Sequence, residues 1–319
     1  MDNQSLIIHY QFSFTPYKRP FRQPLRTRYG VWKIREGIII SIQDHKGNIR
    51  DGEIAPLPQF GSETLEEALN FCAQLKEITE TEIYQIPNHL PACQFAFESA
   101  LAGFKFPPLQ RRVRGDSLNQ AIAPDRFPLS CLLPAGETAL TAWREGWKQG
   151  QKTFKWKIGV FPLAQELTWL QALADRLPSS AKLRLDANGG LTLAEAKQWL
   201  KMADKLGKIE FLEQPLPPDQ FKQMQALETA FQTAIALDES VGTLEQLESC
   251  YERGWRGIFV VKCAIAGSPR RLRKLCEQYN LDLVFSSAME SSIGREAVFR
   301  LAREISLQRD LGFGINHWF

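Results

Sequence analysis

The chain has 319 residues, 44% of them hydrophobic, which is enough for one large α/β barrel or for two average domains with substantial cores. Lys and Arg number 39 against 36 Asp and Glu, and a net charge of +3 this evenly spread gives no sign of a nucleic-acid partner. The first twenty residues lack a signal-peptide pattern, no run of about 18 apolar residues occurs, and the six cysteines have no CxxC spacing. We therefore expect a cytoplasmic protein without a membrane or nucleic-acid partner; the oligomeric state stays open.

The first hundred or so residues are typical of a small α+β domain. Strand-like runs cover residues 6–14, 37–44 and 49–55, and a turn at 45–48 between the last two favours an antiparallel sheet. Thr64 and Glu67 form the Thr-x-x-Glu pattern of a helix start, and a second helix is predicted over residues 91–103. We place this domain at residues 1–108.

From about residue 128 onward, strands and helices alternate. Strands are predicted at residues 129–136, 153–159, 182–190, 210–216, 234–240, 257–263 and 281–290, and a segment near 305–315 offers an eighth. One helix between them starts with the Thr192–Glu195 capping pattern and stops at Gly207. Parallel strands with right-handed crossovers follow, so the expected fold class is α/β, a (β/α)₇β TIM-type barrel with an N-terminal α+β capping domain.

The barrel is predicted to occupy residues 109–300, with 301–319 as its last segment and a C-terminal tail. A doubly wound open sheet is the alternative. No glycine-rich phosphate loop follows any of the predicted strands to support it.

Polar residues stand at the C-terminal ends of successive predicted strands, where the sites of such barrels lie. They are Lys157, Asp186, Glu213, Asp238, Lys262 and Ser286. Taken singly, a strand lysine is usually a surface group, and an Asp before a loop usually caps a turn or a helix. Matched positions on successive strands favour a functional site instead.

Asp186, Glu213 and Asp238 would lie on three adjacent strands. Three carboxylates in a buried place repel one another strongly unless a cation neutralises them. Oxygen ligands suit Mg²⁺, with Mn²⁺ as a second candidate, and none of the four histidines lies near these strand ends, which disfavours zinc or iron. The sequence therefore predicts a Mg²⁺ site.

The lysines flank this predicted metal site. Lys157 and Lys262 come from the second and sixth strands, four places apart in a ring of eight, and should face each other across the barrel. Lys155 shares a strand face with Lys157 and is predicted to lower the pKa of Lys157, which favours a neutral amine that accepts a proton. Such a site suits proton removal next to a carboxylate, so the predicted partner is a small-molecule carboxylate.

Two function classes remain as alternatives at this point. A Schiff-base aldolase would also place a lysine in a barrel, but it would not explain three carboxylates on adjacent strands. A non-catalytic barrel that acts as a binding protein would have no reason to keep all five charged residue types at the strand ends.

Five short segments resemble the muconate-lactonising subgroup of the enolase superfamily: KWK at 155–157, LDAN at 185–188, LEQP at 212–215, ALDES at 236–240 and VVK at 260–262. The resemblance covers nearly the whole chain and implies a capped (β/α)₇β barrel whose C-terminal tail often returns to the cap. Residues 19–42 and 52–68 resemble the capping domain of the o-succinylbenzoate synthase family. This implies dehydration of 2-succinyl-6-hydroxy-2,4-cyclohexadiene-1-carboxylate to 2-succinylbenzoate, in menaquinone and phylloquinone biosynthesis.

The resemblance also implies a role for each site residue. Lys157 would remove the α proton and, as its conjugate acid, help the hydroxide to leave from the same face. Lys262 would stabilise the enediolate from the opposite face, and Asp186, Glu213 and Asp238 would bind Mg²⁺. The expected supporting residues are Lys155, Asn188, Glu239 and Arg184, the last pointing inward one layer deeper.

The segment SSAMESSIG at 286–294 is a candidate for substrate binding, because backbone N–H groups at a helix start can hold the succinyl carboxylate. Its candidate residues are Ser286, Ser291, Ser292, Ile293 and Gly294. The same scaffold also supports N-succinylamino acid racemisation, dipeptide epimerisation and muconate cycloisomerisation, which need the same lysines and metal. Against dipeptide epimerisation, the terminal LGFGINHWF holds no Asp-x-Asp pair.

Overall fold

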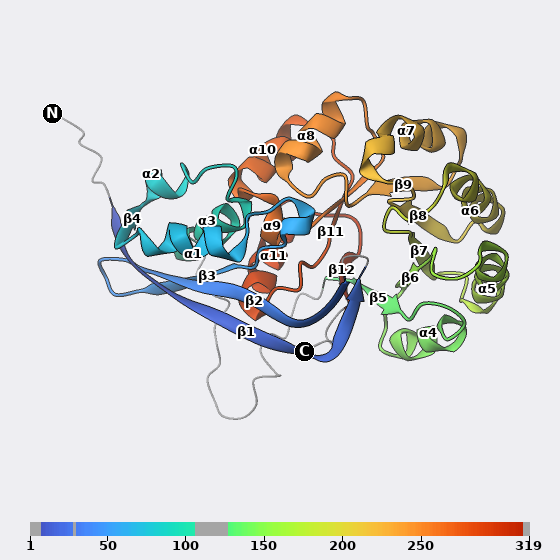
Figure 1. Cartoon of the computed structure of the whole chain (residues 1–319), viewed down its shortest axis with the longest axis horizontal. Helices are drawn as coiled ribbons and strands as arrows, with labels where there is room; N and C mark the ends of the chain where they lie inside the picture. The colour runs from blue at the N-terminus through green and yellow to red at the C-terminus, as the bar shows by residue number, and fades with distance from the viewer. Residues whose placement is uncertain (1–7, 28–29, 106–126, 315–319) are drawn as a thin grey trace.

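The computed structural model describes residues 8–27, 30–105 and 127–314, which form two parts (Figure 1). A four-stranded antiparallel sheet with helices on it forms the first part. An eight-stranded parallel sheet ringed by helices forms the second. The predicted fold class, a TIM-type barrel with an N-terminal α+β cap, is therefore confirmed.

The cap sheet has the order β3-β2-β1-β4. Its strands are β1 (His9–Thr27), β2 (Gly30–Gln43), β3 (Ile49–Ile54) and β4 (Glu77–Thr79). The sequence predicted the first three, but β1 and β2 are much longer than expected and β4 was missed. The prolines at 16 and 20 concealed the length of β1, which pairs with β4 only over residues 9–11. Beyond those residues β1 has no second described partner strand, and such an edge tolerates proline.

Three helices complete the cap: α1 (Leu65–Ala73), α2 (Glu80–Ile83) and α3 (Pro91–Lys105). The predicted capping box of α1 is present, with Thr64 and Glu67 bonded to each other's backbone. Helix α3 lies against β3, and a Cβ on Gly52 would stand only 2.2 Å from the carbonyl oxygen of Ala96. Glycine at 52 therefore permits this close helix–sheet contact.

The eight barrel strands occur where the sequence predicted them. They are β5 (Leu129–Leu133), β6 (Thr153–Lys157), β7 (Lys182–Asp186), β8 (Ile209–Glu213), β9 (Ala234–Leu237), β10 (Ile258–Val261), β11 (Leu283–Phe285) and β12 (Leu311–Gly314). Parallel pairing runs from β5 to β11, β12 pairs with β5, and a bridge between Ser286 and Gly312 links the two ends. The ring is nearly closed, so the open-sheet alternative is wrong.

The helices that follow the barrel strands are α4 (Ala139–Lys148), α5 (Leu163–Arg176), α6 (Leu193–Leu206), α7 (Phe221–Ala230), α8 (Leu244–Glu252), α9 (Cys263–Ala266), α10 (Pro269–Gln278) and α11 (Ser292–Glu304). The predicted start and stop of α6 are confirmed: Thr192 and Glu195 form a capping box, and Gly207 has the left-handed conformation. The apolar face of β6 packs outward, with the Trp156 ring 6.2 Å from that of Trp199 on α6. The charged face of β6 therefore points into the barrel.

Of the predicted domain boundaries, only the one between residues 300 and 301 falls within the described residues. The boundary between residues 108 and 109 falls in the range 106–126, and the tail in 315–319; both ranges lie outside the described residues. The boundary between 300 and 301 falls inside α11, ahead of the last barrel strand β12, and the division into domains stays a prediction.

The cap rests on the barrel beside the ends of β9 to β11. Strand β3 contacts α9 and α11, and α3 contacts α9 and α10. The short helix η1 (Pro58–Phe60) reaches the loop after β9, where a Cβ on Gly242 would lie 1.8 Å from the carbonyl oxygen of Phe60. The cap and the C-terminal ends of the barrel strands are thus in direct contact.

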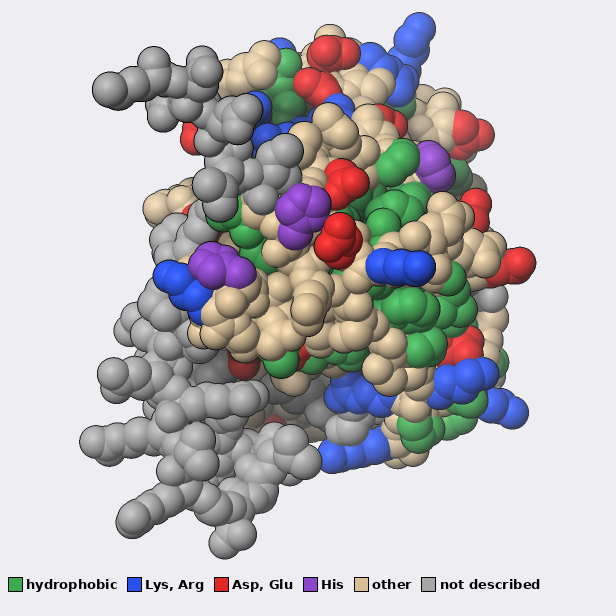
Figure 2. Space-filling view, turned by 90° about the vertical axis from the view of Figure 1, so that its left-hand side faces the viewer, with side chains coloured by type: hydrophobic (Ala, Val, Ile, Leu, Met, Phe, Trp, Pro, Cys, Tyr) green, Lys and Arg blue, Asp and Glu red, His purple; other side chains and the backbone are tan. Residues whose placement is uncertain are grey.

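The cap side of the molecule carries mixed charge. On this face Lys and Arg side chains occupy several separate places, and acidic side chains lie among them (Figure 2). This distribution agrees with the net charge of only +3. Among the helices of the described residues, none combines the length and the apolar character that crossing a bilayer requires.

Candidate functional site

The five charged residues predicted from the strand ends all lie at the same end of the barrel. Lys157, Asp186 and Glu213 end β6, β7 and β8 and are aligned side by side in the sheet register. Asp238 lies one residue past β9, and Lys262 one residue past β10. The three carboxylate residues are at most 7% exposed. Parallel strands in register present such side chains to one common place.

An apolar layer lies beneath this site. Five residues that alternate along the strands form one buried cluster inside the barrel: Phe211, Ala236, Ile258, Val260 and Val284. Their side chains exclude water from below the carboxylates. Charges at the site therefore interact more strongly than they would in solvent.

Lys155 bridges two of the carboxylates. Its Nζ lies 2.8 Å from Asp186 Oδ2 and 2.6 Å from Glu213 Oε1. Burial alone would lower the pKa of Lys155, but Asp186 and Glu213 outweigh it, so the pKa lies above its ordinary value. The ammonium is thus held by carboxylates, and the influence of Lys155 on Lys157 that the sequence suggested stays a prediction.

The carboxylate cluster is short of positive charge. Burial, with the nearby charges of Asp186 and Asp238, raises the pKa of Glu213 well above its ordinary value. In the described part of the chain no three acidic, His or Cys side chains are arranged as a ready metal site, and Lys155 and Lys262 contact the carboxylates instead. Carboxylates that repel one another at close range suit a hard divalent cation, because its positive charge offsets the repulsion and it prefers oxygen ligands.

Asn188 and Glu239 stand beside the carboxylates, as predicted. The backbone N–H of Asn188 donates to Asp186 Oδ1 over 3.0 Å, and its side-chain amide donates to Glu239 Oε1 over 3.3 Å. Burial, then Asp238 and Asp186, raise the pKa of Glu239 to about 7. The hydrogen bond between the Asn188 amide and Glu239 connects the loops after β7 and β9.

The two catalytic candidates differ in their surroundings. Lys262 forms an ion pair with Asp238, and its Nζ lies 4.2 Å from the centre of the Phe60 ring in the cap. Lys157 is half-buried, and its side chain makes no hydrogen bond or ion pair within the described residues. The sequence did not identify Phe60, because only the fold brings the cap to the sixth barrel strand.

Substitution Gly242→Ala is expected to disturb this cap contact. Its methyl group would collide with the Phe60 carbonyl oxygen, and such overpacking costs about 1–3 kcal/mol. We expect a lower urea midpoint together with a reduced kcat/KM, because Phe60 covers Lys262. Urea unfolding and steady-state kinetics test this. An unchanged kcat/KM in a destabilised variant would show that the contact between Gly242 and Phe60 stabilises the fold without affecting catalysis.

Arg184 points inward, as predicted, but toward the other end of the barrel. It is 1% exposed, and its Nε donates to Glu210 over 2.7 Å while Nη1 donates to the Asp310 carbonyl over 2.8 Å. Arg309 joins Glu210 to Asp282 from the same side. Arg184 lies one layer deeper, as expected, and contacts none of the site carboxylates; its supporting role at the site stays a prediction.

The start of α11 also differs from the prediction. The N–H groups of Ser291 and Gly294 donate to the carboxylate of Glu53 in β3, at 2.8 and 2.9 Å, and the Ser291 hydroxyl donates to it as well. The N–H of Ile293 is taken by the Ser291 Oγ. A cap carboxylate thus already fills the place expected for a substrate carboxylate, and this assignment of Ser291, Ile293 and Gly294 is wrong.

Two residues of the segment 286–294 remain candidates for substrate binding. Ser286 lies at the barrel end, on the same strand face as the inward Val284 and beside Gly312. Ser292 is the first residue of α11. Their part in substrate binding stays a prediction.

Replacing Glu53 with leucine is expected to lower the free energy of unfolding by about 3 kcal/mol, because buried donors lose their acceptor. These are the N–H groups of Ser291 and Gly294 and the Tyr17 hydroxyl, which donates over 2.5 Å. Urea unfolding measures the loss. Unchanged stability with a large rise in KM would instead restore the substrate-binding assignment of the α11 start.

Two family models match the chain. The model described as "MenC, N-terminal domain" matches residues 11–104, and the one described as "Enolase C-terminal domain-like" matches residues 138–311. They cover the cap and the barrel respectively.

Proteins named o-succinylbenzoate synthase match nearly the whole chain. The one from Thermosynechococcus vestitus is 42% identical over 308 residues, covering 95% of this chain and 91% of the relative. The one from Yersinia enterocolitica is 31% identical over 294 residues, covering 90% and 84%.

Solved structures agree with these relatives. The o-succinylbenzoate synthase from Thermosynechococcus elongatus, complexed with Mg in the active site, has a TM-score of 0.88 and 41% identity, covering 97% of this chain and 94% of the other. The L-Ala-D/L-Glu epimerase from Bacillus subtilis has a TM-score of 0.79 over 98% and 91% of the two chains. At 21% identity this second likeness concerns the fold alone.

Proposed function

Because this chain belongs to the o-succinylbenzoate synthase family of the enolase superfamily, we propose that it is a hydro-lyase that dehydrates 2-succinyl-6-hydroxy-2,4-cyclohexadiene-1-carboxylate to 2-succinylbenzoate. The family resemblance inferred from the sequence motifs is confirmed by these relatives. The observation that carries the proposal is the pair of lysines on barrel strands four places apart, flanking three buried carboxylates, in a chain 42% identical to a synthase. We assign the product to menaquinone or phylloquinone biosynthesis.

Asp186, Glu213 and Asp238 are the residues that we assign to Mg²⁺, with Mn²⁺ as a chemically similar substitute. The buried oxygen donors on adjacent strands support this, as does the Mg in the related Thermosynechococcus elongatus structure. When bound, the cation supplies positive charge that favours loss of a proton next to the substrate carboxylate. Asn188 and Glu239 hold the neighbouring loops in place.

Lys157 and Lys262 carry the proton chemistry. The neutral amine of Lys157 accepts the proton from ring carbon 1, and the electrons of that C–H bond spread into the substrate carboxylate before they form a new ring double bond as the C–O bond at carbon 6 breaks. Lys157 then returns the proton to the departing hydroxide, so that water leaves from the same face. Lys262, on the opposite side, stabilises negative charge on the substrate carboxylate. The product ring is aromatic, which drives the elimination.

We further propose that the protein acts in the cytoplasm. The six cysteines are free thiols, and four of them are buried, as in proteins of a reducing compartment.

The decisive test follows the ultraviolet absorbance of the cyclohexadiene substrate with purified protein, first with EDTA and then with added Mg²⁺. We expect conversion to 2-succinylbenzoate only with the metal. Intact Mn²⁺ binding without conversion would reject the dehydration and direct the search to N-succinylamino acids and dipeptides, whose racemisation polarimetry detects. Conversion that ignores EDTA would favour a lysine-only mechanism such as a Schiff base.

A further inference from the structure

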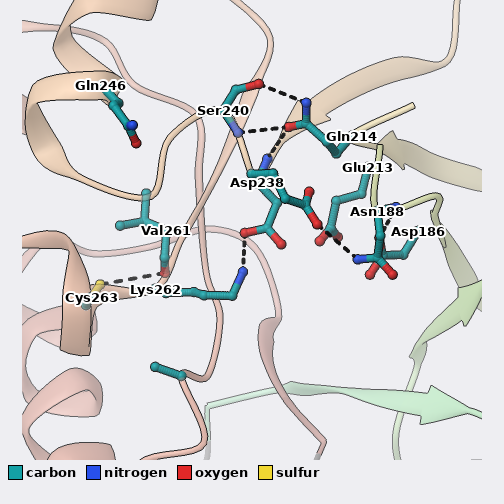
Figure 3. Close-up of polar contacts among 12 residues, drawn as sticks. Asp186, Asn188, Glu213, Gln214, Asp238, Ser240, Gln246, Val261, Lys262 and Cys263 are labelled. Atoms are coloured by element: carbon teal, nitrogen blue, oxygen red, sulfur yellow. Dashed lines mark hydrogen bonds and ion pairs between the residues drawn. The ribbon is translucent and has the colours of Figure 1, made fainter. Parts of the chain in front are cut away.

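Gln214 is a fully buried residue that directly follows Glu213 in the loop after β8. Its φ of 37° is rare for a residue with a side chain, so the surrounding contacts must hold it there. Sequence reasoning passed over it because glutamine carries no charge and performs no proton chemistry. Figure 3 shows its amide turned toward the loop that carries Asp238 and Ser240.

Every polar atom of this amide has a partner. The carbonyl oxygen Oε1 accepts from the N–H groups of Asp238, over 3.0 Å, and Ser240, over 3.2 Å. The nitrogen Nε2 donates to Ser240 Oγ over 2.8 Å and to the Leu216 carbonyl over 2.9 Å. Exchanging oxygen and nitrogen would set donors against donors, so the pattern fixes the orientation of the amide.

The backbone of Gln214 contacts one neighbouring strand and one neighbouring loop. Its N–H donates to the Ala236 carbonyl in β9 over 2.7 Å, and its carbonyl accepts from the N–H of Gly189, over 2.6 Å, in the loop after Asp186. One residue therefore joins the loops after β7, β8 and β9. Each of these loops begins at one of the carboxylates assigned to Mg²⁺.

We propose that Gln214 is a positioning residue that sets the relative places of Asp186, Glu213 and Asp238, and so sets the affinity for the divalent cation. This rests on the metal assignment made above. Three ligands on separate strands bind one small ion well only if their loops keep a fixed spacing, and groups that orient ligands typically change metal affinity 10–100-fold when removed. The contacts of Gln214 reach all three loops.

The test is a titration with Mn²⁺, read from the electron paramagnetic resonance signal of the free ion without substrate. Methionine has nearly the size of glutamine but offers no amide. We expect Gln214→Met to weaken Mn²⁺ binding at least about tenfold. Its dehydration rate should recover toward the unmodified rate as Mg²⁺ is raised, because the lysines are untouched.

Gln94→Met is the matched control. Gln94 is also buried, at 9% exposure, and its amide likewise joins separate segments: Nε2 donates to the Ile86 carbonyl and Oε1 accepts from the Ser268 N–H. Within the described residues, its side-chain hydrogen bonds go to Ile86, Asn88 and Ser268 and not to the residues of the three carboxylate loops. Its substitution should lower stability comparably while leaving Mn²⁺ affinity unchanged.

Equal Mn²⁺ affinity in the Gln214 and Gln94 variants would overturn the proposal, as would an unmodified protein that binds no Mn²⁺. If Gln214→Met does not fold, Ser240→Ala decides instead, because it removes only the hydroxyl that accepts from Nε2. A severalfold weaker Mn²⁺ affinity in that variant supports the proposal, and an unchanged affinity rejects it. An unmodified protein that binds Mn²⁺ but leaves the diene unchanged would sink the dehydration alone.

Discussion

Substitution Lys157→Ala is expected to lower kcat by about 10³-fold, the size of a lost general acid–base group, while Mn²⁺ affinity stays unchanged. The structure gives the reason for this separation. Lys157 is half-buried at the end of β6, and within the described residues its side chain makes no hydrogen bond or ion pair. Its removal therefore takes away a base without releasing a carboxylate. Stopped-flow turnover of the diene and Mn²⁺ titration measure the two quantities.

Lys155→Met supplies the matched control, since it removes a lysine from the same strand face. Lys155 pairs with Asp186 and Glu213, so its loss should change metal affinity and stability as well as turnover. A Lys157→Ala variant that keeps more than about a tenth of kcat would refute its role as the base. A variant that loses Mn²⁺ binding would show instead that Lys157 belongs to the metal site.

The period of the strands made most of the barrel site predictable. Lys157, Asp186 and Glu213 were placed together from their positions at strand ends, and the sheet register aligns them. The lengths of the barrel strands were overestimated, because the polar loop residues that follow each strand look like its continuation. Asn188 and Gln214, both with positive φ, turn the chain away just there.

Contacts between distant segments could not be predicted in this way. Glu53 and Ser291 are separated by most of the barrel in sequence, and nothing in either segment indicates that one fills the helix start of the other. A helix N-terminus attracts any anion, and from the sequence a substrate was as good a candidate as a cap carboxylate. The fold, by docking β3 against α11, decides the matter.

Arg184 shows the limit of strand period from another side. Its inward direction followed from the period, but a long side chain can turn up or down the barrel axis. The Arg184 side chain points toward the start of β8, because its guanidinium donates to the carboxylate of Glu210 there. Burial would raise the pKa of Glu210, yet Arg184 and Arg309 outweigh burial and hold the pKa below its ordinary value.

Arg184→Met is therefore expected to destabilise the fold by about 3 kcal/mol, because it leaves the buried Glu210 carboxylate and the Asp310 carbonyl short of donors. The turnover of the folded protein should stay within about twofold, since Arg184 contacts no site carboxylate. A carboxyl with a lowered pKa stabilises the fold above the ordinary glutamate pKa of about 4.3 and loses that contribution as the pH falls below it. The stability difference between the two proteins should accordingly shrink in acid.

Urea unfolding at several pH values, with steady-state kinetics at pH 7, measures both effects. Lys182→Met is the control, because Lys182 lies 3.9 Å from the same carboxylate but its side chain is 63% exposed. An exposed pair of this kind contributes about 0.5 kcal/mol or less. If Arg184→Met kept its stability but lost turnover, Arg184 would act at the site, as the sequence first suggested. If Arg184→Met and Lys182→Met lowered the free energy of unfolding equally, the buried Arg184 would be no stronger a partner of Glu210 than the exposed Lys182.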